Sequence, residues 1–201
     1  MIRLLTSDGT PLEISTDPPS HWPFCALRQG EWVILCGARE GGKSWWLRKA
    51  ALQARDTGIP FLYWELSGFY RSRRWRADPN RLLLLDDWEV SVVHQESDAR
   101  LPQTARGVVA VHLSKQRVVA RMQANSVRWP WPFHRDAEVV VVELSRGPWS
   151  GNPSQRASLP RLPSSWTVQK EGDLLSEMRG VGGEARYGYR YHAWPPLPEE
   201  D

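Results

Sequence analysis

The chain has 201 residues with a formal net charge of +3, and 41% of its residues are hydrophobic. This length suits one α/β domain with short additions and is enough to bury a core without disulfides or a metal. No run of about eighteen apolar residues occurs, and the first residues lack the apolar segment of a signal peptide, so we expect neither a membrane span nor secretion. The two cysteines, Cys25 and Cys36, have no metal-ligand neighbours at useful spacing, which favours a reducing compartment such as the cytoplasm.

Basic residues are unevenly distributed along the chain. Residues 99–135 hold seven Lys or Arg and no acid, and residues 66–77 hold four Arg and no acid. Such segments can contact the phosphate backbone of a nucleic acid, but they equally suit a solvated basic face that acids elsewhere balance. Among the twelve Trp, Trp129 and Trp131 are candidates for stacking on bases, with core packing as the alternative.

In chain order, residues 1–30 contain the pattern of a β-hairpin around a Ser-Asp-Gly-Thr-Pro turn. Residues 31–36 form a nearly continuous apolar run, which is typical of a strand buried on both faces. Residues 44–55 carry apolar side chains at helical spacing and precede a glycine, which predicts a helix. Later apolar runs predict strands at residues 59–66, 81–86, 107–113 and 138–144, with a helix at residues 115–127 and a less clear one at residues 89–105.

The alternation of strands and helices predicts an α/β fold with a mainly parallel five-stranded sheet flanked by helices. We expect this core to span residues 31–146, preceded by the hairpin extension of residues 1–30. Residues 147–201 begin with a segment rich in Pro, Ser and Gly. They are therefore expected to form a linker and a small irregular C-terminal extension, in which residues 165–194 add either a short strand pair or a helix.

The segment between the first strand and the first helix, GAREGGKS at residues 37–44, matches the complete G-x-x-x-x-G-K-[ST] pattern. Its glycines allow backbone N–H groups to turn around a phosphate, and the helix that follows directs its positive end at the same anion. Lys43 is expected to neutralise β- and γ-phosphate oxygens of ATP, and Ser44 to offer its hydroxyl to Mg²⁺. The residues expected to bind the nucleotide are Gly37, Arg39, Gly41, Gly42, Lys43 and Ser44.

Two acids follow four leucines at the end of the predicted third strand. A carboxylate at the carboxyl end of a central strand faces the ligand crevice, so we expect Asp86 to hold the magnesium ion. Asp87 is the first candidate for the base that orients and deprotonates the attacking water. Glu89 and Glu65 compete for that role, and one of the two aspartates could instead cap the next helix.

Polar residues end the predicted fourth strand, beside the expected position of the γ-phosphate. Ser114 and Gln116 are candidate sensors that hydrogen-bond the γ-phosphate or the attacking water, with an ordinary loop as the alternative. His112 lies within the apolar run, where a core histidine is expected. An arginine reaching into a neighbouring subunit is a further candidate group, and the arginines available for it are Arg106, Arg117, Arg121 and Arg128.

These motifs resemble those of P-loop NTPases whose catalytic acid is separate from the magnesium aspartate, over about residues 31–144. The segments LLLLDD, TARGVVAVHLSKQR and MQANSV look most like the HerA/FtsK-type DNA translocases, including genome-packaging ATPases of tailless double-stranded DNA viruses. That resemblance implies that Gln116 is the γ-phosphate sensor and that ATP binds between the subunits of a ring. Two features depart from the pattern: Lys43 and Asp86 are closer in sequence than is usual, and Asp87 stands where Glu is common.

The resemblance implies an ATPase that moves double-stranded DNA through a homo-oligomeric ring during packaging by a virus or phage. Its partners would be ATP, Mg²⁺, DNA and a capsid or portal component, in the host cytoplasm or in a virion. Residues 42–67 are also similar to RecA-like helicases, which would favour Glu65 as the base. Together with LLLLDDWE they are similar to DnaA-like or DnaC-like replication ATPases as well. A nucleotide-binding module without motor activity is the remaining alternative.

Overall fold

The structure is a computed structural model that describes residues 2–3, 27–39, 41–65, 80–88, 103–124, 131–134, 137–144, 159–171 and 188–196. Within these ranges the chain forms two α-helices, one short 3₁₀ turn and a single sheet of eight strands. In chain order the elements are β1 (Ile2–Arg3), β2 (Glu31–Cys36), α1 (Lys43–Asp56), β3 (Phe61–Glu65), β4 (Leu82–Asp86), β5 (Arg106–Ala110), α2 (Lys115–Gln123), β6 (Glu138–Glu143), the 3₁₀ turn (Ser164–Trp166), β7 (Thr167–Glu171) and β8 (Gly188–Trp194).

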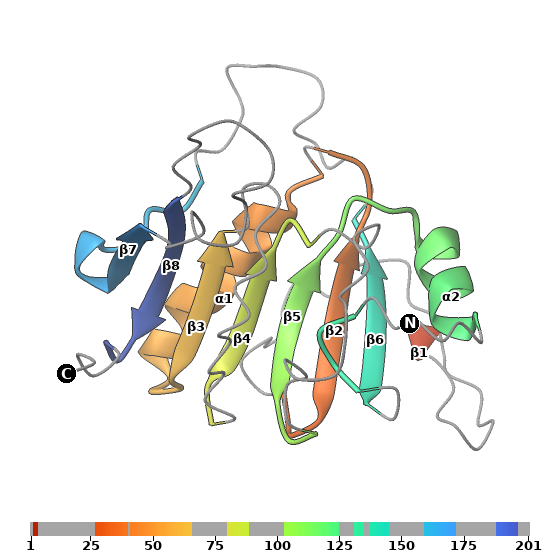
Figure 1. The fold of residues 1–201 in the computed structure, drawn as a ribbon, viewed down its shortest axis with the longest axis horizontal. Coiled ribbons are helices and arrows are strands. Elements are labelled where there is room, and N and C mark those ends of the chain that lie inside the picture. Colours follow the sequence, from red (N-terminus) through yellow and green to blue (C-terminus); the bar gives the residue numbers. More distant parts are fainter. Residues whose placement is uncertain are drawn as a thin grey trace, which may run out of the picture.

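Five parallel strands form the middle of the sheet, whose full order is β1-β6-β2-β5-β4-β3-β8-β7 (Figure 1). Every neighbouring pair from β6 to β3 is parallel. β1 is antiparallel to β6 at one edge, and β8 is antiparallel to β3 at the other, with β7 outside it. The carboxyl ends of the five parallel strands therefore lie side by side along one end of the sheet, at the top of Figure 1.

The predicted α/β class is confirmed, and the five predicted strands are present and parallel to one another. The predicted five-stranded sheet is wrong, because antiparallel strands at both edges make a mixed sheet of eight strands. The C-terminal extension contains the strand pair that was one of the two alternatives for residues 165–194, and it is not simply irregular, since β7 and β8 belong to this sheet. An uncovered β3 would present a row of unpaired backbone donors and acceptors, and β8 satisfies them.

The two predicted helices are observed, and only their ends differ from the expectation. α1 extends one residue beyond the predicted segment at each end, whereas α2 ends at Gln123 instead of reaching residue 127. β5 ends at Ala110, three residues before the predicted strand end. Most of the predicted hairpin, at residues 4–26, and residues 89–102 of the less clear helix lie outside the described residues.

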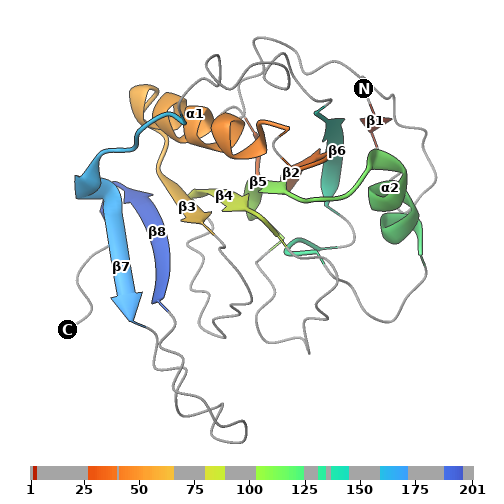
Figure 2. The same ribbon diagram turned by 90° about the horizontal axis from the view of Figure 1, so that it is seen from above.

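The sheet separates two apolar layers, and α1 covers one of its faces (Figure 2). Successive residues of β2 alternate between them: Val33 and Leu35 face α1, and Ile34 and Cys36 face the opposite layer. Four buried residues of α1 lie against the sheet, and three of them are alanines: Leu47, Ala50, Ala51 and Ala54. Such small side chains let the helix lie close to the strands, which fixes the position of its amino end beside the loop after β2.

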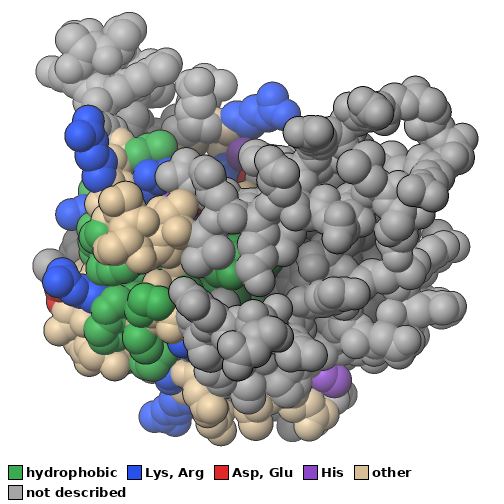
Figure 3. Space-filling view, turned by 60° about the vertical axis from the view of Figure 1, so that its left-hand side comes forward, with side chains coloured by type: hydrophobic (Ala, Val, Ile, Leu, Met, Phe, Trp, Pro, Cys, Tyr) green, Lys and Arg blue, Asp and Glu red, His purple; other side chains and the backbone are tan. Residues whose placement is uncertain are grey.

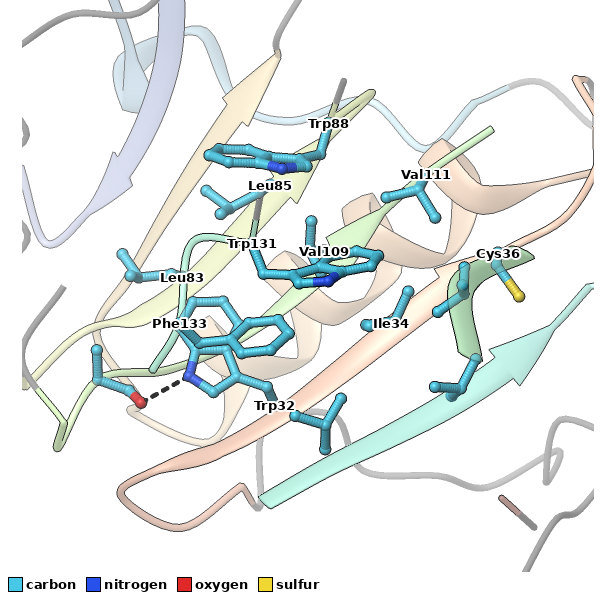
Figure 4. Close-up of a cluster of buried hydrophobic side chains, with 14 of the residues drawn as sticks. Trp32, Ile34, Cys36, Leu83, Leu85, Trp88, Val109, Val111, Trp131 and Phe133 are labelled. Carbon is cyan, nitrogen blue, oxygen red and sulfur yellow. Dashed lines mark hydrogen bonds between the residues drawn. The ribbon is translucent and has the colours of Figure 1, made fainter. Parts of the chain in front are cut away.

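The opposite face is covered by α2 and by a cluster of aromatic side chains (Figure 4). The indole nitrogen of Trp32 donates to the carbonyl oxygen of Ala105 over 2.9 Å. Phe133 lies between two indoles, with ring centroids 5.2 Å from Trp32 and 5.8 Å from Trp131. The structure therefore places Trp131 in the core, whereas Trp129 lies outside the described residues. No helix in the described ranges is both long enough and apolar enough to cross a bilayer.

Candidate functional site

The loop that follows β2 approaches the end of β6 closely, which only glycine permits. Gly37 has a φ of 135°, and a Cβ atom built on it would lie 2.5 Å from the carbonyl oxygen of Leu144. Its N–H donates to the carbonyl oxygen of Leu113 over 2.7 Å, so the loop also contacts the segment after β5. Gly42 ends the loop with a φ of 83°, again in the left-handed region that favours glycine. The glycine pattern of the sequence thus has a steric cause in this fold.

The amino end of α1 has neither a side-chain cap nor an acidic residue in its first turn, so it can bind an anion. Gly42 is the N-cap residue and provides no side-chain cap, and the first turn contains no acid. The first N–H groups of a helix have no partners within the helix, and its dipole favours negative charge at that end. A phosphate group would satisfy both, so this helix end fits the anion that the sequence motif predicts.

Lys43 is buried at the first position of α1, with 4% of its surface exposed. Its ammonium donates to the carbonyl oxygens of Gly37 over 3.0 Å and Ala38 over 2.6 Å, and so spans the loop. Burial lowers the pKa of Lys43, while the nearby charge of Asp86 acts in the opposite direction. The side chain thus places a positive charge inside the loop, where negative charge on a ligand would compensate its burial.

Asp86 at the end of β4 and Ser44 at the start of α1 meet, although β4 and β2, the strand that leads into α1, are not neighbours. Ser44 Oγ lies 3.2 Å from Asp86 Oδ1, across the width of β5, which separates β2 from β4. The N–H of Asp87 donates to the same oxygen over 3.0 Å, and the Tyr63 hydroxyl donates to Oδ2 over 2.9 Å. Burial raises the pKa of the Asp86 carboxyl, and these hydrogen bonds partly oppose that shift. The aspartate is therefore a buried carboxyl held on both oxygens.

The donor set of this site fits a magnesium ion bound together with nucleotide phosphates. A hydroxyl and a carboxylate supply hard oxygen ligands, which Mg²⁺ prefers, and it normally completes its shell with waters and phosphate oxygens. In the described part of the chain no group of three or more His, Cys, Asp or Glu could hold a metal by itself. The predicted pair of Ser44 and Asp86 is thus brought together, and ATP phosphates would have to supply further ligands.

Asp87 lies directly after β4 in a strained backbone conformation. Its φ is 54°, a left-handed value that is uncommon for residues other than glycine. Its Oδ1 lies 2.6 Å from Nε2 of His112, and the next N–H, of Trp88, donates to the carbonyl oxygen of Ala110 over 2.8 Å. About half of the Asp87 side chain remains exposed to solvent. Strain of this kind often marks functional positions, and here it directs the carboxylate toward the end of β5.

The expectation that His112 is a core histidine is wrong. β5 ends at Ala110, so His112 falls in the loop at the carboxyl end of the strand, where 38% of its side chain is exposed. The apolar residue Leu113 that follows it had extended the apparent strand. His112 and Tyr63 are the two residues beside the acids that sequence reasoning missed as site components.

Glu65 is engaged by two basic side chains. Its Oε1 lies 2.5 Å from Arg48 Nη2 of α1 and 3.3 Å from His192 Nε2 of β8, although the latter does not have hydrogen-bond geometry. The register of β3 against β4 places Glu65 opposite Asp86. Glu65 therefore lies at the same end of the sheet as Asp86 and Asp87, but the guanidinium of Arg48 neutralises its carboxylate.

The two candidate sensors lie at the start of α2. Ser114 is its N-cap residue, with the hydroxyl accepting from the N–H of Arg117 over 3.5 Å. Gln116 is exposed in the first turn, and within the described ranges no hydrogen bond joins it to the loop at residues 37–44. The N–H of Lys115 donates to Glu143 Oε1 over 3.1 Å, which anchors the helix to the end of β6.

The other predicted site residues that the structure describes lie away from this group. Arg39 is exposed in the loop after β2, and Arg117 and Arg121 are exposed on α2. Arg106 begins β5, at the opposite end of the strands from that loop, and donates to the carbonyl oxygen of Leu27 over 2.7 Å. It therefore anchors the segment before β2. Glu89 and Arg128 lie outside the described residues.

Lys43, Ser44, Asp86 and Asp87 are thus gathered at the carboxyl edge of the parallel strands, where α/β sheets bind ligands. Gln116 and Arg106 are not part of this group. No protein-family model, curated protein or solved structure matches the chain in the comparisons made. The assignment of a function rests on the sequence motifs and on this geometry.

Proposed function

We propose that this chain is a P-loop NTPase that binds Mg-ATP at the loop after β2 and hydrolyses it. The observation that carries the proposal is the contact of 3.2 Å between Ser44 Oγ and Asp86 Oδ1, next to the buried ammonium of Lys43. Ser44 and Asp86, which are 42 positions apart in the sequence, thus lie in contact. Their hydroxyl and carboxylate are the oxygen ligands that magnesium requires, and the ammonium of Lys43 suits a phosphate.

The interposed strand also supports the proposal. β5 lies between the P-loop strand β2 and the acidic strand β4. A strand inserted at this position is the arrangement expected of the P-loop NTPases that the sequence resembles, in which the catalytic acid is separate from the magnesium aspartate. The end of β5 then faces the acids from between the two strands, which is where His112 contacts Asp87.

Each side chain has a distinct part in the proposed reaction. Lys43 and the N–H groups at the start of α1 bind the phosphates. Ser44 and Asp86 hold magnesium, which when bound neutralises phosphate oxygens as charge moves onto the leaving group. Asp87 orients the attacking water and accepts its proton, and His112 holds the Asp87 carboxylate. Glu65 is the weaker candidate for the base, because its carboxylate is paired with Arg48.

Calorimetry with Mg-ATP tests the binding step. The native chain should release heat on titration, and Lys43→Ala should abolish it. Lys49→Ala is the matched control, since Lys49 is an exposed lysine on the same helix whose ammonium lies 5.3 Å from the Trp45 ring centroid. The control should bind Mg-ATP normally. An absence of binding by the native chain would overturn the proposal.

We further propose that hydrolysis drives movement of double-stranded DNA through a homo-oligomeric ring, as in viral genome packaging. This rests on the resemblance to HerA/FtsK-type translocases and on the basic segment of residues 99–135. On the described part of the face in Figure 3, basic side chains lie around apolar ones and do not merge into one patch. The proposed DNA contacts are therefore assigned to the basic segment and not to this face.

The DNA step has its own test. Duplex DNA should raise the rate of ATP hydrolysis more than single-stranded DNA of the same length, and light scattering with Mg-ATP should detect a closed oligomer. Stronger stimulation by single strands would favour a replication helicase or loader instead. A monomer whose rate of ATP hydrolysis is unchanged by either nucleic acid would favour the alternative of a nucleotide-binding module without motor activity.

A further inference from the structure

Tyr63 lies in the middle of β3 with its side chain fully buried on the α1 face of the sheet. Its ring is packed among apolar side chains, yet its hydroxyl reaches the polar edge and donates to Asp86 Oδ2 over 2.9 Å. A buried phenol needs a hydrogen-bond partner, and here that partner is the carboxyl assigned to magnesium.

The two oxygens of Asp86 have different partners. Oδ2 accepts from Tyr63, whereas Oδ1 accepts from the N–H of Asp87 and lies 3.2 Å from Ser44 Oγ. The two oxygens of a carboxylate are equivalent, so these contacts do not choose between them, but turning the plane of the carboxylate would break all three. The Tyr63 hydroxyl therefore helps to hold the carboxylate plane in the orientation in which one oxygen faces the serine hydroxyl.

The ring of Tyr63 is itself held by the C-terminal strand. His192 of β8 is its cross-strand partner, and the two rings are stacked with centroids 5.5 Å apart and planes 19° from parallel. His192 is 2% exposed, and its Nδ1 lies 3.0 Å from the hydroxyl oxygen of Thr167 at the start of β7. A chain of contacts thus runs from the outer strands through Tyr63 to Asp86.

We propose that Tyr63 is a positioning residue for the magnesium ligand Asp86, and that β8 supports it through the stack with His192. This inference rests on the proposed binding of Mg-ATP at this site. It assigns to the C-terminal strands a part in metal affinity, because they hold the ring whose hydroxyl orients the carboxylate. It does not assign Tyr63 a contact with the nucleotide.

The test compares magnesium dependence with metal-free nucleotide binding. Tyr63→Phe removes one hydroxyl and keeps the ring, so ATP binding in excess EDTA should match the native chain, as measured by calorimetry. The Mg²⁺ concentration that gives half of the metal-dependent gain in affinity should rise by roughly tenfold or more, because a hydrogen bond to a charged group is lost. Mn²⁺ binding in the presence of a non-hydrolysable ATP analogue, followed by electron paramagnetic resonance, should weaken to the same degree.

Two further variants separate this role from a general loss of packing. Tyr191→Phe alters a buried tyrosine of β8 that faces the opposite layer, and its Mg²⁺ requirement should stay native. His192→Leu removes the flat ring from Tyr63 and should raise the Mg²⁺ requirement in the same direction as Tyr63→Phe. This variant carries the test if Tyr63→Phe does not fold.

The outcomes are distinguishable. A native Mg²⁺ requirement in folded Tyr63→Phe, alongside a native chain that binds Mg-ATP, would overturn the positioning role and leave the proposed function intact. Equal weakening by Tyr191→Phe would also overturn it, since the effect would then not be specific to the Asp86 contact. A native chain that binds no Mg-ATP would overturn both proposals.

Discussion

His112 Nε2 lies 2.6 Å from Asp87 Oδ1, and this contact joins the ends of β5 and β4 beside the loop after β2. The imidazole can hold the plane of the Asp87 carboxylate in one orientation. A carboxylate that is half exposed and locally strained needs such a partner to keep one orientation.

Replacing Asp87 should separate binding from hydrolysis. Asp87→Asn should bind Mg-ATP with native affinity and lose at least about 100-fold in turnover, the range expected for loss of a general base. Phosphate release measures the rate, and calorimetry measures the affinity. Asp56→Asn, at the exposed end of α1, is a charge-matched control that should retain native turnover.

Replacing His112 should have a smaller effect of the same kind. His112→Ala removes the partner of Asp87 but no group assigned to phosphate or magnesium, so turnover should fall by roughly tenfold with unchanged Mg-ATP affinity. Since both side chains are partly exposed, the melting temperature should change little. A large loss of affinity would show that the imidazole acts on the nucleotide directly.

Glu65 provides the decisive comparison for the identity of the base. Glu65→Gln removes the charged partner of Arg48, and because both side chains are only about one-fifth exposed it should cost about 1.5–3 kcal/mol of folding free energy, but it should keep most of the turnover. Thermal unfolding and phosphate release measure the two effects. If Glu65→Gln is inactive while Asp87→Asn turns over normally, the RecA-like hypothesis is correct and the assignment of Asp87 is wrong.

Gly37 should not tolerate a side chain. Gly37→Ala would place a methyl group 2.5 Å from the Leu144 carbonyl oxygen in addition to the cost of a left-handed φ, so the loop must move and nucleotide binding should be lost. Gly58→Ala is the control, because Gly58 also has a positive φ but no atom within 4 Å of the added carbon. It should cost only about 1–2 kcal/mol in denaturant unfolding and keep binding.

Cys36 should be chemically inert in the folded chain. Burial, followed by the charge of Glu143, raises the pKa of its thiol from 9.0 to about 12. At pH 8 the thiolate fraction should therefore be on the order of a thousandfold below that of an ordinary cysteine, and alkylation correspondingly slow. Peptide mapping after iodoacetamide treatment measures modification at Cys36 separately from Cys25. Modification at the rate of the unfolded chain would contradict this.

The same shift has a consequence for stability at high pH. The unfolded chain loses the Cys36 proton above about pH 9, whereas the folded chain keeps it to about pH 12. Because the folded pKa is raised, the contribution of this thiol to folding free energy is complete below pH 9 and is lost as pH rises from 9 to 12. Denaturant unfolding at pH 8 and pH 10.5 should show a decrease that is smaller in Cys36→Ala, in which buried Tyr63, whose pKa is also raised, still contributes.

The central strands were predictable because each has a local signal. A strand buried on both faces must be nearly continuous in apolar residues. A short strand pair was one alternative for residues 165–194, but its place in the sheet was not predictable. That place depends on the pairing of β8 with β3, which lies far away in sequence. Local patterns do not encode that pairing.

The site was predictable in its motif residues and not in their partners. Tyr63 reaches Asp86 only because β3 and β4 are adjacent and in one register, which a single sequence does not reveal. A weak signal existed, since Tyr63 and Glu65 share one face of β3 by strand alternation. His112 was misplaced because its apolar neighbours extended the apparent strand past Ala110. Three residues of strand length, between Ala110 and the predicted end at residue 113, decided between a core side chain and a site component.

Because β5 lies between β2 and β4, the distance between Ser44 and Asp86 depends on the packing inside the sheet. At the amino end of β5 Gly107 packs so tightly that an added methyl carbon would lie 2.4 Å from the Leu83 carbonyl oxygen and 2.8 Å from the Trp32 ring. A larger residue there would push β4 away from β2 without touching any ligand. Magnesium affinity at the proposed site would then depend on how closely β2, β5 and β4 pack at their amino ends, far from the metal ligands.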